Sequence, residues 1–311
     1  MRSMTTITIR PAILGDAAAI TAVHCSTVNE WRDPITRQPA TYTTLGLFGR
    51  WYNGGPWMSA EMCAIHLNAL LVSGHLPLVA EVEGSIVGEV EFYANPEPPP
   101  FGPHLHLSIL YVHNDWQQRG LGRALIEAGV DYARVRNLSA LTTQPEAETT
   151  SFYHHVGFRP WLHAQEMQIA TYGAPPPFAR LHHDSGPPTH LALRVGRYQC
   201  GAQNWETLWP SLALAELTAL RRNVWSGKLD GSPVVVGLRE QFRNPTQADG
   251  YAWLLPSAPL TPVVDALRGL GAREGYHAID LLLPEDALPE LKATFRLDYQ
   301  ATVALWRREI P

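Results

Sequence analysis

The chain has 311 residues and a formal net charge of −5 at pH 7, with 45% hydrophobic and 17% charged residues. This length suggests about two folded domains, and the apolar content is sufficient for real cores and excludes a disordered chain. The mildly acidic balance argues against a nucleic-acid partner, which usually needs a basic face, and is compatible with a cationic substrate.

The sequence indicates neither disulfides nor a metal site. The cysteines Cys25, Cys63 and Cys200 are odd in number and lack C-x-x-C spacing. The histidine pairs at 154–155 and 182–183 are poor chelators, because neighbours on a helix point about 100° apart and the second pair lies in a Pro-rich stretch. No signal peptide precedes the first strand, and no apolar run is long enough to cross a bilayer. We therefore expect a cytoplasmic protein with no metal and no membrane association.

The first half is predicted to alternate strands and helices in an α+β arrangement. A Gly15-Asp16 start opens its first helix, Gly84-Ser85 makes a hairpin turn, and Gly157 ends its last helix. The predicted strands span 5–10, 78–83, 86–93, 105–112, 140–143 and 161–170; the predicted helices span 16–28, 58–71, 121–136 and 149–155.

A Pro- and Gly-rich stretch, residues 171–189, is predicted to be a linker between a domain at 1–170 and a domain at 190–311. Beyond it we expect strands at 191–195, 233–238, 251–255, 279–283 and 301–307 and helices at 212–224, 263–272 and 286–295. Because 263–307 repeats the order of 121–170, the fold is expected to be two tandem copies of a mixed, mostly antiparallel sheet flanked by helices.

The most informative segment is a turn, Gln117-Gln118-Arg119-Gly120-Leu121-Gly122, between a strand and an apolar helix. Amides at a helix N-terminus have no intrahelical acceptor and favour anions, and glycine lets a phosphate approach the backbone closely. The turn is therefore suited to a pyrophosphate. A Walker A loop would need Lys and Ser/Thr where Arg123-Ala124 stand, and a dinucleotide fingerprint would need a third glycine. A ligand-free strand-to-helix turn is the ordinary alternative.

This segment resembles the GNAT superfamily of N-acetyltransferases, whose pattern is Gln/Arg-x-x-Gly-x-Gly/Ala after a strand. Two further features are similar to that family: Phe152-Tyr153 followed by Gly157-Phe158, and the opening at 7–12 with Gly15-Asp16. The resemblance covers roughly residues 5–170, and the second half is similar in element order only. At the place of the turn the second half has three prolines within 254–262, which donate no amides, so we expect no second cofactor site there.

The resemblance implies acetyl-coenzyme A as acetyl donor and names the residues that would contact it. The strand would pair with the pantetheine arm, chiefly through Val112, and the turn amides would hold the pyrophosphate. The implied cofactor-binding residues are Leu110, Val112, Gln117, Gln118, Arg119, Gly120, Leu121, Gly122 and Arg123.

Tyr153 occupies the family position whose phenol protonates the departing thiolate, and a phenol of pKa about 10 is close enough to a thiol near 8.5 for that transfer. Two residues depart from the family pattern. Glu146 stands where an Asn near the cofactor is common, and Asn114 replaces the usual Pro after the strand.

A base is needed because an amine acceptor is mostly ammonium at pH 7. His106 lies where some relatives carry a catalytic glutamate, and its imidazole could take the proton. Alternation predicts a strand face shared by His104, His106, Ser108, Leu110 and Val112.

Glu89 and Glu91 on the neighbouring strand are competing candidates for the base, although we favour a solvated strand face for both.

In this fold the segment at 29–75 lines the acceptor cleft. Its aromatic residues either form a wall for a bulky or cationic amine or pack the segment onto the sheet: Trp31, Tyr42, Trp51, Tyr52 and Trp57.

The sequence thus predicts an N-acetyltransferase that passes an acetyl group to the primary amine of a small molecule or peptide by direct attack in a ternary complex. The alternative is a non-catalytic acyl-coenzyme A sensor, and a third interpretation keeps catalysis with a longer acyl chain or an oxygen acceptor. A monomer or a homodimer is expected.

Overall fold

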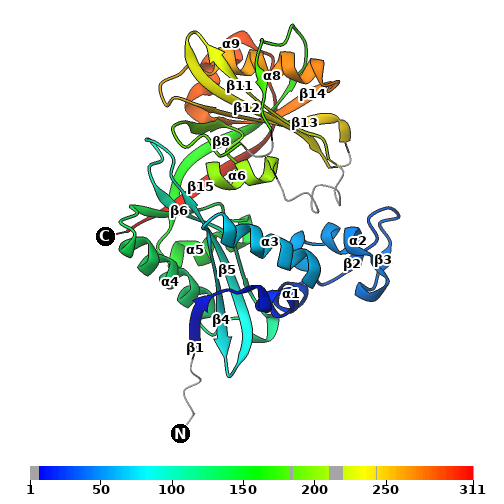
Figure 1. The fold of residues 1–311 in the computed structure, drawn as a ribbon, viewed down its shortest axis with the longest axis vertical. Coiled ribbons are helices and arrows are strands. Elements are labelled where there is room, and N and C mark those ends of the chain that lie inside the picture. Colours follow the sequence, from blue (N-terminus) through cyan, green and yellow to red (C-terminus); the bar gives the residue numbers. More distant parts are fainter. Residues whose placement is uncertain (1–6, 183–184, 210–219, 243, 311) are drawn as a thin grey trace.

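The computed structural model describes residues 7–182, 185–209, 220–242 and 244–310. We call residues 7–170 the first half and residues 171–310 the second half; they form the lower and upper lobes of Figure 1. One thirteen-stranded sheet runs through the described part of both halves, in the order β1-β4-β5-β6-β7-β15-β8-β14-β13-β12-β11-β9, with β10 paired to β13. No helix among these residues combines the length and apolar character that crossing a bilayer requires.

The elements of the first half follow the predicted order closely. They are β1 (Ile7–Pro11), α1 (Ala17–Cys25), β2 (Trp31–Arg32), β3 (Pro39–Ala40), α2 (Leu47–Tyr52), α3 (Ala60–Val72), β4 (Leu76–Val82), β5 (Ser85–Asn95), β6 (His104–Val112), α4 (Leu121–Val135), β7 (Ala140–Thr143), α5 (Thr150–His155) and β8 (Arg159–Ala170). Single 3-10 turns occupy Leu14–Asp16, Tyr42–Thr44, Pro56–Met58, Asn114–Trp116, Ala147–Thr149 and, in the second half, Glu285–Ala287.

The second half contains β9 (Ala179–Arg180), β10 (Ala192–Val195), α6 (Gly201–Leu208), β11 (Arg222–Leu229), β12 (Ser232–Gln241), β13 (Asn244–Leu254), α8 (Thr261–Arg273), β14 (Ala278–Pro284), α9 (Leu288–Thr294) and β15 (Asp298–Glu309). The helix predicted at 212–224 is wrong at its end, because Arg222 begins a strand paired with β12; its residues 212–219 lie outside the described part. Helix α6 was not predicted. Within the expected linker, Phe178 is buried in the core of the second half and β9 pairs with β11.

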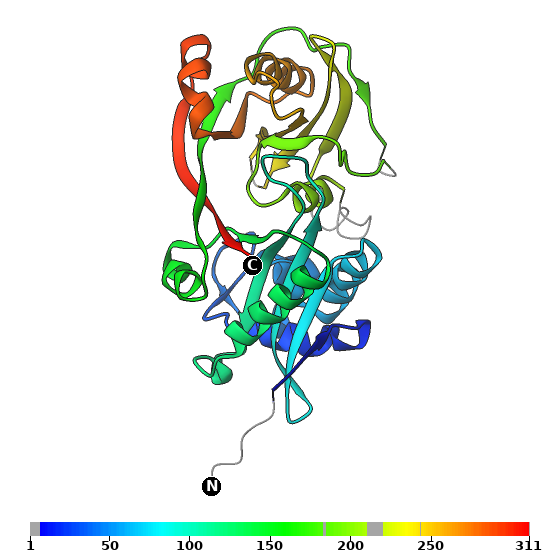
Figure 2. The ribbon, with the colours of Figure 1, turned by 90° about the vertical axis from the view of Figure 1, so that its left-hand side faces the viewer.

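The last strands of the two halves are exchanged. Strand β15 lies between β7 and β8, and β8 in turn pairs with β14 of the second half. Figures 1 and 2 show these two long strands, green and red, running between the lobes, with the C-terminus back at the first half. Each half therefore has its sheet completed by a strand of the other.

Helices cover both faces of the first-half sheet (Figure 1). On one face, Ile20 of α1 and Leu67 of α3 pack on the sheet. On the other, Leu125 and Val130 of α4 pack against Phe92. Aliphatic residues at helical spacing thus bury one side of each helix.

A β-bulge interrupts β6 at Ser108. Across the β5–β6 pair, Glu91 lies opposite Ile109 and Phe92 opposite Leu107, so Ser108 is an extra residue. An extra residue reverses the alternation of side chains beyond it. Leu110 consequently joins the apolar cluster under α4 that also holds Leu107.

The prediction that His104, His106, Ser108, Leu110 and Val112 share a strand face is therefore wrong. Leu110 and Val112 lie with the cluster under α4, whereas Tyr111 points to the opposite face and contacts the ring of His24 on α1.

Candidate active site

The turn that precedes α4 presents a row of backbone amides at the start of the helix. Gly120 is the N-cap residue with φ +84°, and Gln118 also has a positive φ of +60°. The amide of Ala124 is bonded to the Gly120 carbonyl oxygen at 3.0 Å, the first i→i−4 bond of the helix. The amides before it in the helix have no intrahelical acceptor, and their positive helix end favours an anion.

Glycine is needed for a different reason at each of its two positions in the turn. A Cβ on Gly120 would meet nothing within 4 Å, so this residue is required for its left-handed backbone and leaves open space beside it. A Cβ on Gly122 would lie 3.2 Å from Cζ of Phe152. The glycine at 122 therefore lets α5, which carries Phe152 and Tyr153, approach the start of α4.

Side chains of the turn hydrogen-bond to residues earlier in the chain and leave its backbone amides unused. The side-chain nitrogen Nε2 of Gln117 donates to the Val112 carbonyl oxygen at 3.3 Å. Arg119 donates to the Asp115 carbonyl oxygen at 2.8 Å, and its guanidinium lies 4.7 Å from the ring centre of Trp116. Asn114, the residue that replaces the family proline, ties the turn to α1, because its backbone amide donates to the Ser26 hydroxyl at 3.1 Å. These bonds hold the turn in one shape without using the amides of residues 118–123.

Strands β6 and β7 diverge toward this turn, and we call the edge of β6 at residues 108–112, which no second strand covers within the described residues, the groove. The two strands are parallel and pair only at Leu105–Leu107 with Leu141–Thr143. Beyond that point, within the described residues, residues 108–112 have β5 on one side and no strand on the other. An exposed strand edge can pair with an extended ligand through its main chain. The groove therefore connects the amide row to the bulge at Ser108.

Tyr153 on α5 lies beside this groove. It is 8% exposed and packs edge-on against Phe152 and Phe158 at centroid separations of 5.2 and 5.6 Å. Burial raises the pKa of Tyr153 to about 12, and the nearby Glu146 and Tyr111 act in the same direction. The phenol is therefore protonated throughout the physiological range.

His106, the predicted base, is buried and bonded through both ring nitrogens. Nδ1 lies 2.8 Å from the Thr142 hydroxyl oxygen and Nε2 lies 3.2 Å from the side-chain oxygen of Gln199, which belongs to the second half. Burial lowers the pKa of His106 to about 3, and His104 adds to the effect. With no exposed surface and no free nitrogen, this imidazole has the geometry of a structural group and is disfavoured as the base.

The expectation of a solvated face for Glu89 and Glu91 is wrong, because each is only 1% exposed. Glu89 Oε2 lies 2.6 Å from Nε2 of His24, and burial together with the neighbouring Glu91 raises the pKa of Glu89 well above its ordinary value. Glu91 accepts from the indole nitrogen of Trp57 at 2.8 Å and contacts Nε2 of His66 at 3.0 Å. Helices α1 and α3 cover this face, so two buried carboxylates sit beneath them.

The groove of the second half is filled by its own chain. Strands β13 and β14 are parallel and pair only at Gln247–Gly250 with Ala278–Leu281, as β6 and β7 do in the first half. Where they diverge, β10 pairs with β13, placing Leu193 opposite Trp253. The strand edge that is open in the first half is therefore occupied in the second.

Residues 42–158 match the model of the acetyltransferase (GNAT) family. The first half of this chain carries a GNAT acetyltransferase domain. The amide row, the groove and Tyr153 all lie within the matched residues of this GNAT domain or at its borders. No curated protein matched the sequence.

Solved structures resemble the whole chain and not only the GNAT domain. A GCN5-related N-acetyltransferase from Anabaena variabilis has a TM-score of 0.63 at 12% identity, covering 98% of this chain and 73% of that one. A candidate acetyltransferase from Pyrococcus horikoshii has a TM-score of 0.50 at 11% identity, covering 99% and 92%. A tandem GNAT protein from the clavulanic acid biosynthesis pathway has a TM-score of 0.48 at 12% identity, covering 98% and 99%. At identities this low, the first two likenesses establish only the fold, an α+β sheet covered by helices.

A cavity of about 490 Å³ lies between α2 and α3 of the GNAT domain and the second half. Of the aromatic residues predicted to line an acceptor cleft, Trp51 and Trp57 line this cavity, whereas Trp31 and Tyr42 pack edge-on against each other. Phe242 of the second half completes the wall, with its ring centroid 5.4 Å from that of Trp51. Two aromatic residues of this segment therefore line a cavity, and two others pack against each other.

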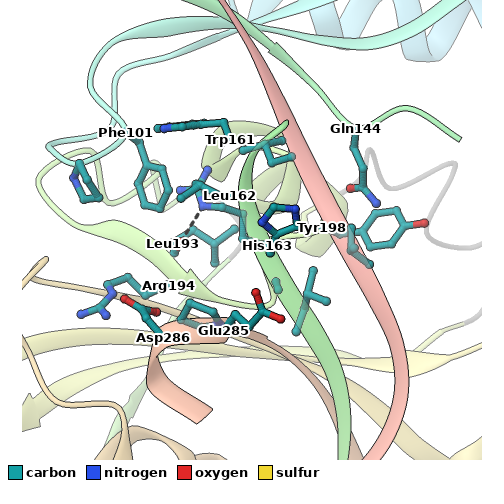
Figure 3. Close-up of a pocket in the computed structure, with 17 residues that line it drawn as sticks. Phe101, Gln144, Trp161, Leu162, His163, Leu193, Arg194, Tyr198, Glu285 and Asp286 are labelled. Carbon is teal, nitrogen blue, oxygen red and sulfur yellow. Dashed lines mark hydrogen bonds between the residues drawn. The ribbon is translucent and has the colours of Figure 1, made fainter. Parts of the chain in front are cut away.

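A second cavity, of about 390 Å³, lies beside the exchanged strands β8 and β15 (Figure 3). The ring of Trp161 lies on one side, and Arg194 and Glu285 lie on the other. Arg194 donates to the Ala258 carbonyl oxygen at 3.0 Å, and Glu285 accepts from the Gln165 side chain at 3.2 Å. Glu285 is thus engaged in joining the two halves, whereas Arg194 is bonded within the second half.

Proposed function

We propose that the protein is an acetyl-coenzyme A-dependent N-acetyltransferase that passes the acetyl group to a primary amine by direct attack in a ternary complex. The observation that carries this proposal is the row of amides at the start of α4, which opens into the groove along β6. Acetyl-coenzyme A supplies an activated thioester, and the chain supplies binding, orientation and proton transfer.

The geometry supports a specific division of labour. The amides of Gln118, Arg119, Gly120, Gly122 and Arg123 would hold the pyrophosphate, with Gln117 and Leu121 shaping the turn around them. The pantetheine arm would pair with the edge of β6 at Leu110 and Val112. This would bring the thioester to the inner end of the groove at Ser108, the bulge residue, which also lines the 490 Å³ cavity.

Tyr153 would then give its proton to the sulfur as the C–S bond breaks. A phenol with pKa about 12 carries this proton at physiological pH. Its transfer is energetically unfavourable until negative charge develops on the sulfur. The acceptor is proposed to be the primary amine of a small molecule or peptide, in keeping with the cavity that both halves build.

The test compares wild type with Tyr153→Phe in a thiol-release assay across a panel of amines, together with calorimetric titration of acetyl-coenzyme A. We expect Tyr153→Phe to lower kcat about 100-fold, as loss of a general acid does, with little change in cofactor affinity. Wild type that binds the cofactor but releases no thiol with any amine would instead support a non-catalytic acyl-coenzyme A sensor.

A further inference from the structure

One imidazole faces the cavity between the halves with a carboxylate behind it. Nε2 of His66, on α3, lies 3.0 and 3.1 Å from the two carboxylate oxygens of Glu91. The Glu91 side chain is 2% exposed, while that of His66 is 15% exposed and lines the cavity. A buried carboxylate that accepts a hydrogen bond from Nε2–H leaves the lone pair on Nδ1, which is the arrangement of a base oriented by an acid.

Glu91 is held in place from more than one side. The Trp57 indole nitrogen donates at 2.8 Å to Oε1 of Glu91, the oxygen that lies 3.0 Å from Nε2 of His66. The ring of Trp57 also lies edge-on to that of His66, with centroids 5.1 Å apart. Two groups, the indole nitrogen of Trp57 and Nε2 of His66, therefore fix the orientation of the Glu91 side chain.

The same pair lies next to the inner end of the groove. Glu91 is opposite Ile109 in the β5–β6 ladder, immediately beside the bulge at Ser108. Ser108 lines the cavity together with His66, and its hydroxyl accepts from the Gln203 side chain of the second half at 2.6 Å. An acceptor in this cavity would therefore meet His66 and the end of the groove at once.

Several charged groups line the cavity with this ring or lie close to it. They are Glu91 on β5, Glu206 on α6, Arg222 on β11, Arg239 and Glu240 on β12, and His24 on α1. Burial lowers the pKa of His66, but the charges of Glu91 and Glu206 outweigh it, so the pKa lies above its ordinary value. A somewhat stronger base suits an ammonium substrate.

We propose that His66, oriented by Glu91, takes the proton from the acceptor amine, and that this amine is carried on an apolar or aromatic body that packs against Trp51, Trp57 and Phe242. The inference rests on the proposed acetyl transfer and names its base and its acceptor class. His66 replaces His106 in the role that the sequence suggested.

The proton balance is complete without a further reactant. The ammonium gives one proton to Nδ1 of His66, and the free amine forms the C–N bond with the acetyl carbon. The C–S bond breaks, and the thiolate takes a proton from Tyr153. The nitrogen loses its second proton, which reloads Tyr153, and His66 releases its own to solvent. One proton is set free for each amide formed.

The experiment measures kcat/KM against pH for wild type, His66→Gln and Glu91→Gln, with 2-phenylethylamine as an aliphatic amine on an aromatic body. His66→Gln is expected to lose about 100-fold in kcat/KM and to lose the acidic limb of the profile, with an unchanged Kd for acetyl-coenzyme A. In Glu91→Gln the limb should move to lower pH, because the charge that raises the pKa of His66 is gone.

Two controls separate catalysis from structure. An arylamine is already unprotonated at pH 7, so its acetylation should depend far less on His66 than that of an alkylamine. His75→Gln removes another histidine bonded to a glutamate, since Nε2 of His75 lies 2.7 Å from Glu206, but His75 does not line the cavity. This variant should keep the acidic limb of the wild type.

The outcomes distinguish the two levels of the proposal. Active wild type with a His66→Gln variant of undiminished kcat/KM and unaltered pH profile would overturn the role of His66 alone. Equal turnover of 2-phenylethylamine and methylamine would overturn the apolar acceptor class. Wild type inactive with all amines would overturn the proposed transfer itself, and the role of His66 with it.

Discussion

Trp306 on the last strand of the chain lies directly opposite Thr143 at the end of β7. This pairing belongs to a strand that the second half supplies to the first, and Trp306 packs at the edge of the core under α4. The sheet that carries the candidate active site is therefore incomplete without residues 298–309.

A truncation that ends near residue 175 should not yield a folded GNAT domain. Without β15 the edge of β7 is exposed and β8 loses both of its neighbours, β15 and β14. We expect aggregation or a molten product, seen as loss of the cooperative thermal transition in circular dichroism and loss of calorimetric cofactor binding. A monomeric, cofactor-binding fragment 1–175 would contradict this account of the exchange.

Replacing Arg308 with Met should weaken the junction between the halves. Its guanidinium donates to both carboxylate oxygens of Glu127 on α4, at 2.9 and 3.0 Å, and to the Val156 carbonyl oxygen at 2.9 Å. We expect the free energy of unfolding to fall by about 1–3 kcal/mol, measured by urea denaturation. The matched control is Arg296→Met, whose side chain is 91% exposed and should change stability little. If the two substitutions lowered the free energy of unfolding equally, the proposed role of Arg308 at the junction would be refuted.

His106→Gln should change the pH dependence of stability more than it changes catalysis. The pKa of His106 is about 3 in the folded chain, below the ordinary value of about 6.5 expected when unfolded. The unfolded chain then binds a proton that the folded chain does not, so stability is present above pH about 6.5 and is lost as pH falls toward 3.

Removal of this group should flatten the acid side of the stability curve, measured as urea midpoints between pH 4 and 7. The buried ring is bonded to Thr142 and Gln199, so some stability is also lost at pH 7. If His106 were instead the base, kcat/KM of the folded variant would collapse while the cofactor still bound.

Titration with acetyl-coenzyme A should give a stoichiometry near one per chain. The groove of the second half is occupied by β10, and prolines stand at 256, 259 and 262 where amides would be needed. Gly120→Ala should weaken this single site by distorting the turn, because an alanine strongly resists φ near +84°. Gly120→Asn should retain more affinity, since asparagine tolerates that conformation better. A stoichiometry near two would show that β10 yields to a second ligand.

The local parts of the site were accessible from the sequence, and the long-range parts were not. Gly120 signals a left-handed residue at a helix start, and the amides that follow are unpaired whatever surrounds them. By contrast, Glu89 and Glu91 alternate with apolar neighbours as a solvated strand would. Their burial depends on α1 and α3 folding over them and on His24 as a partner.

Register was the other source of error. One extra residue at Ser108 sends Leu110 to the opposite face from His106, and a single sequence carries no sign of that bulge. Arg222 was assigned to a helix although its strand is defined by pairing with β12. The nearness of His66 to Glu91 likewise requires the packing of α3 on β5, which local patterns do not report.

The exchanged strand also sets an order of events during synthesis. Strands β1 to β8 leave the ribosome well before β15, because residues 171–297 are made between them. The first-half sheet must wait with a gap between β7 and β8 until β15 has been made, exposing strand edges meanwhile. Newborn chains of this protein are thus expected to rely on chaperones until then, and a premature stop within β15 should be as damaging as one far upstream.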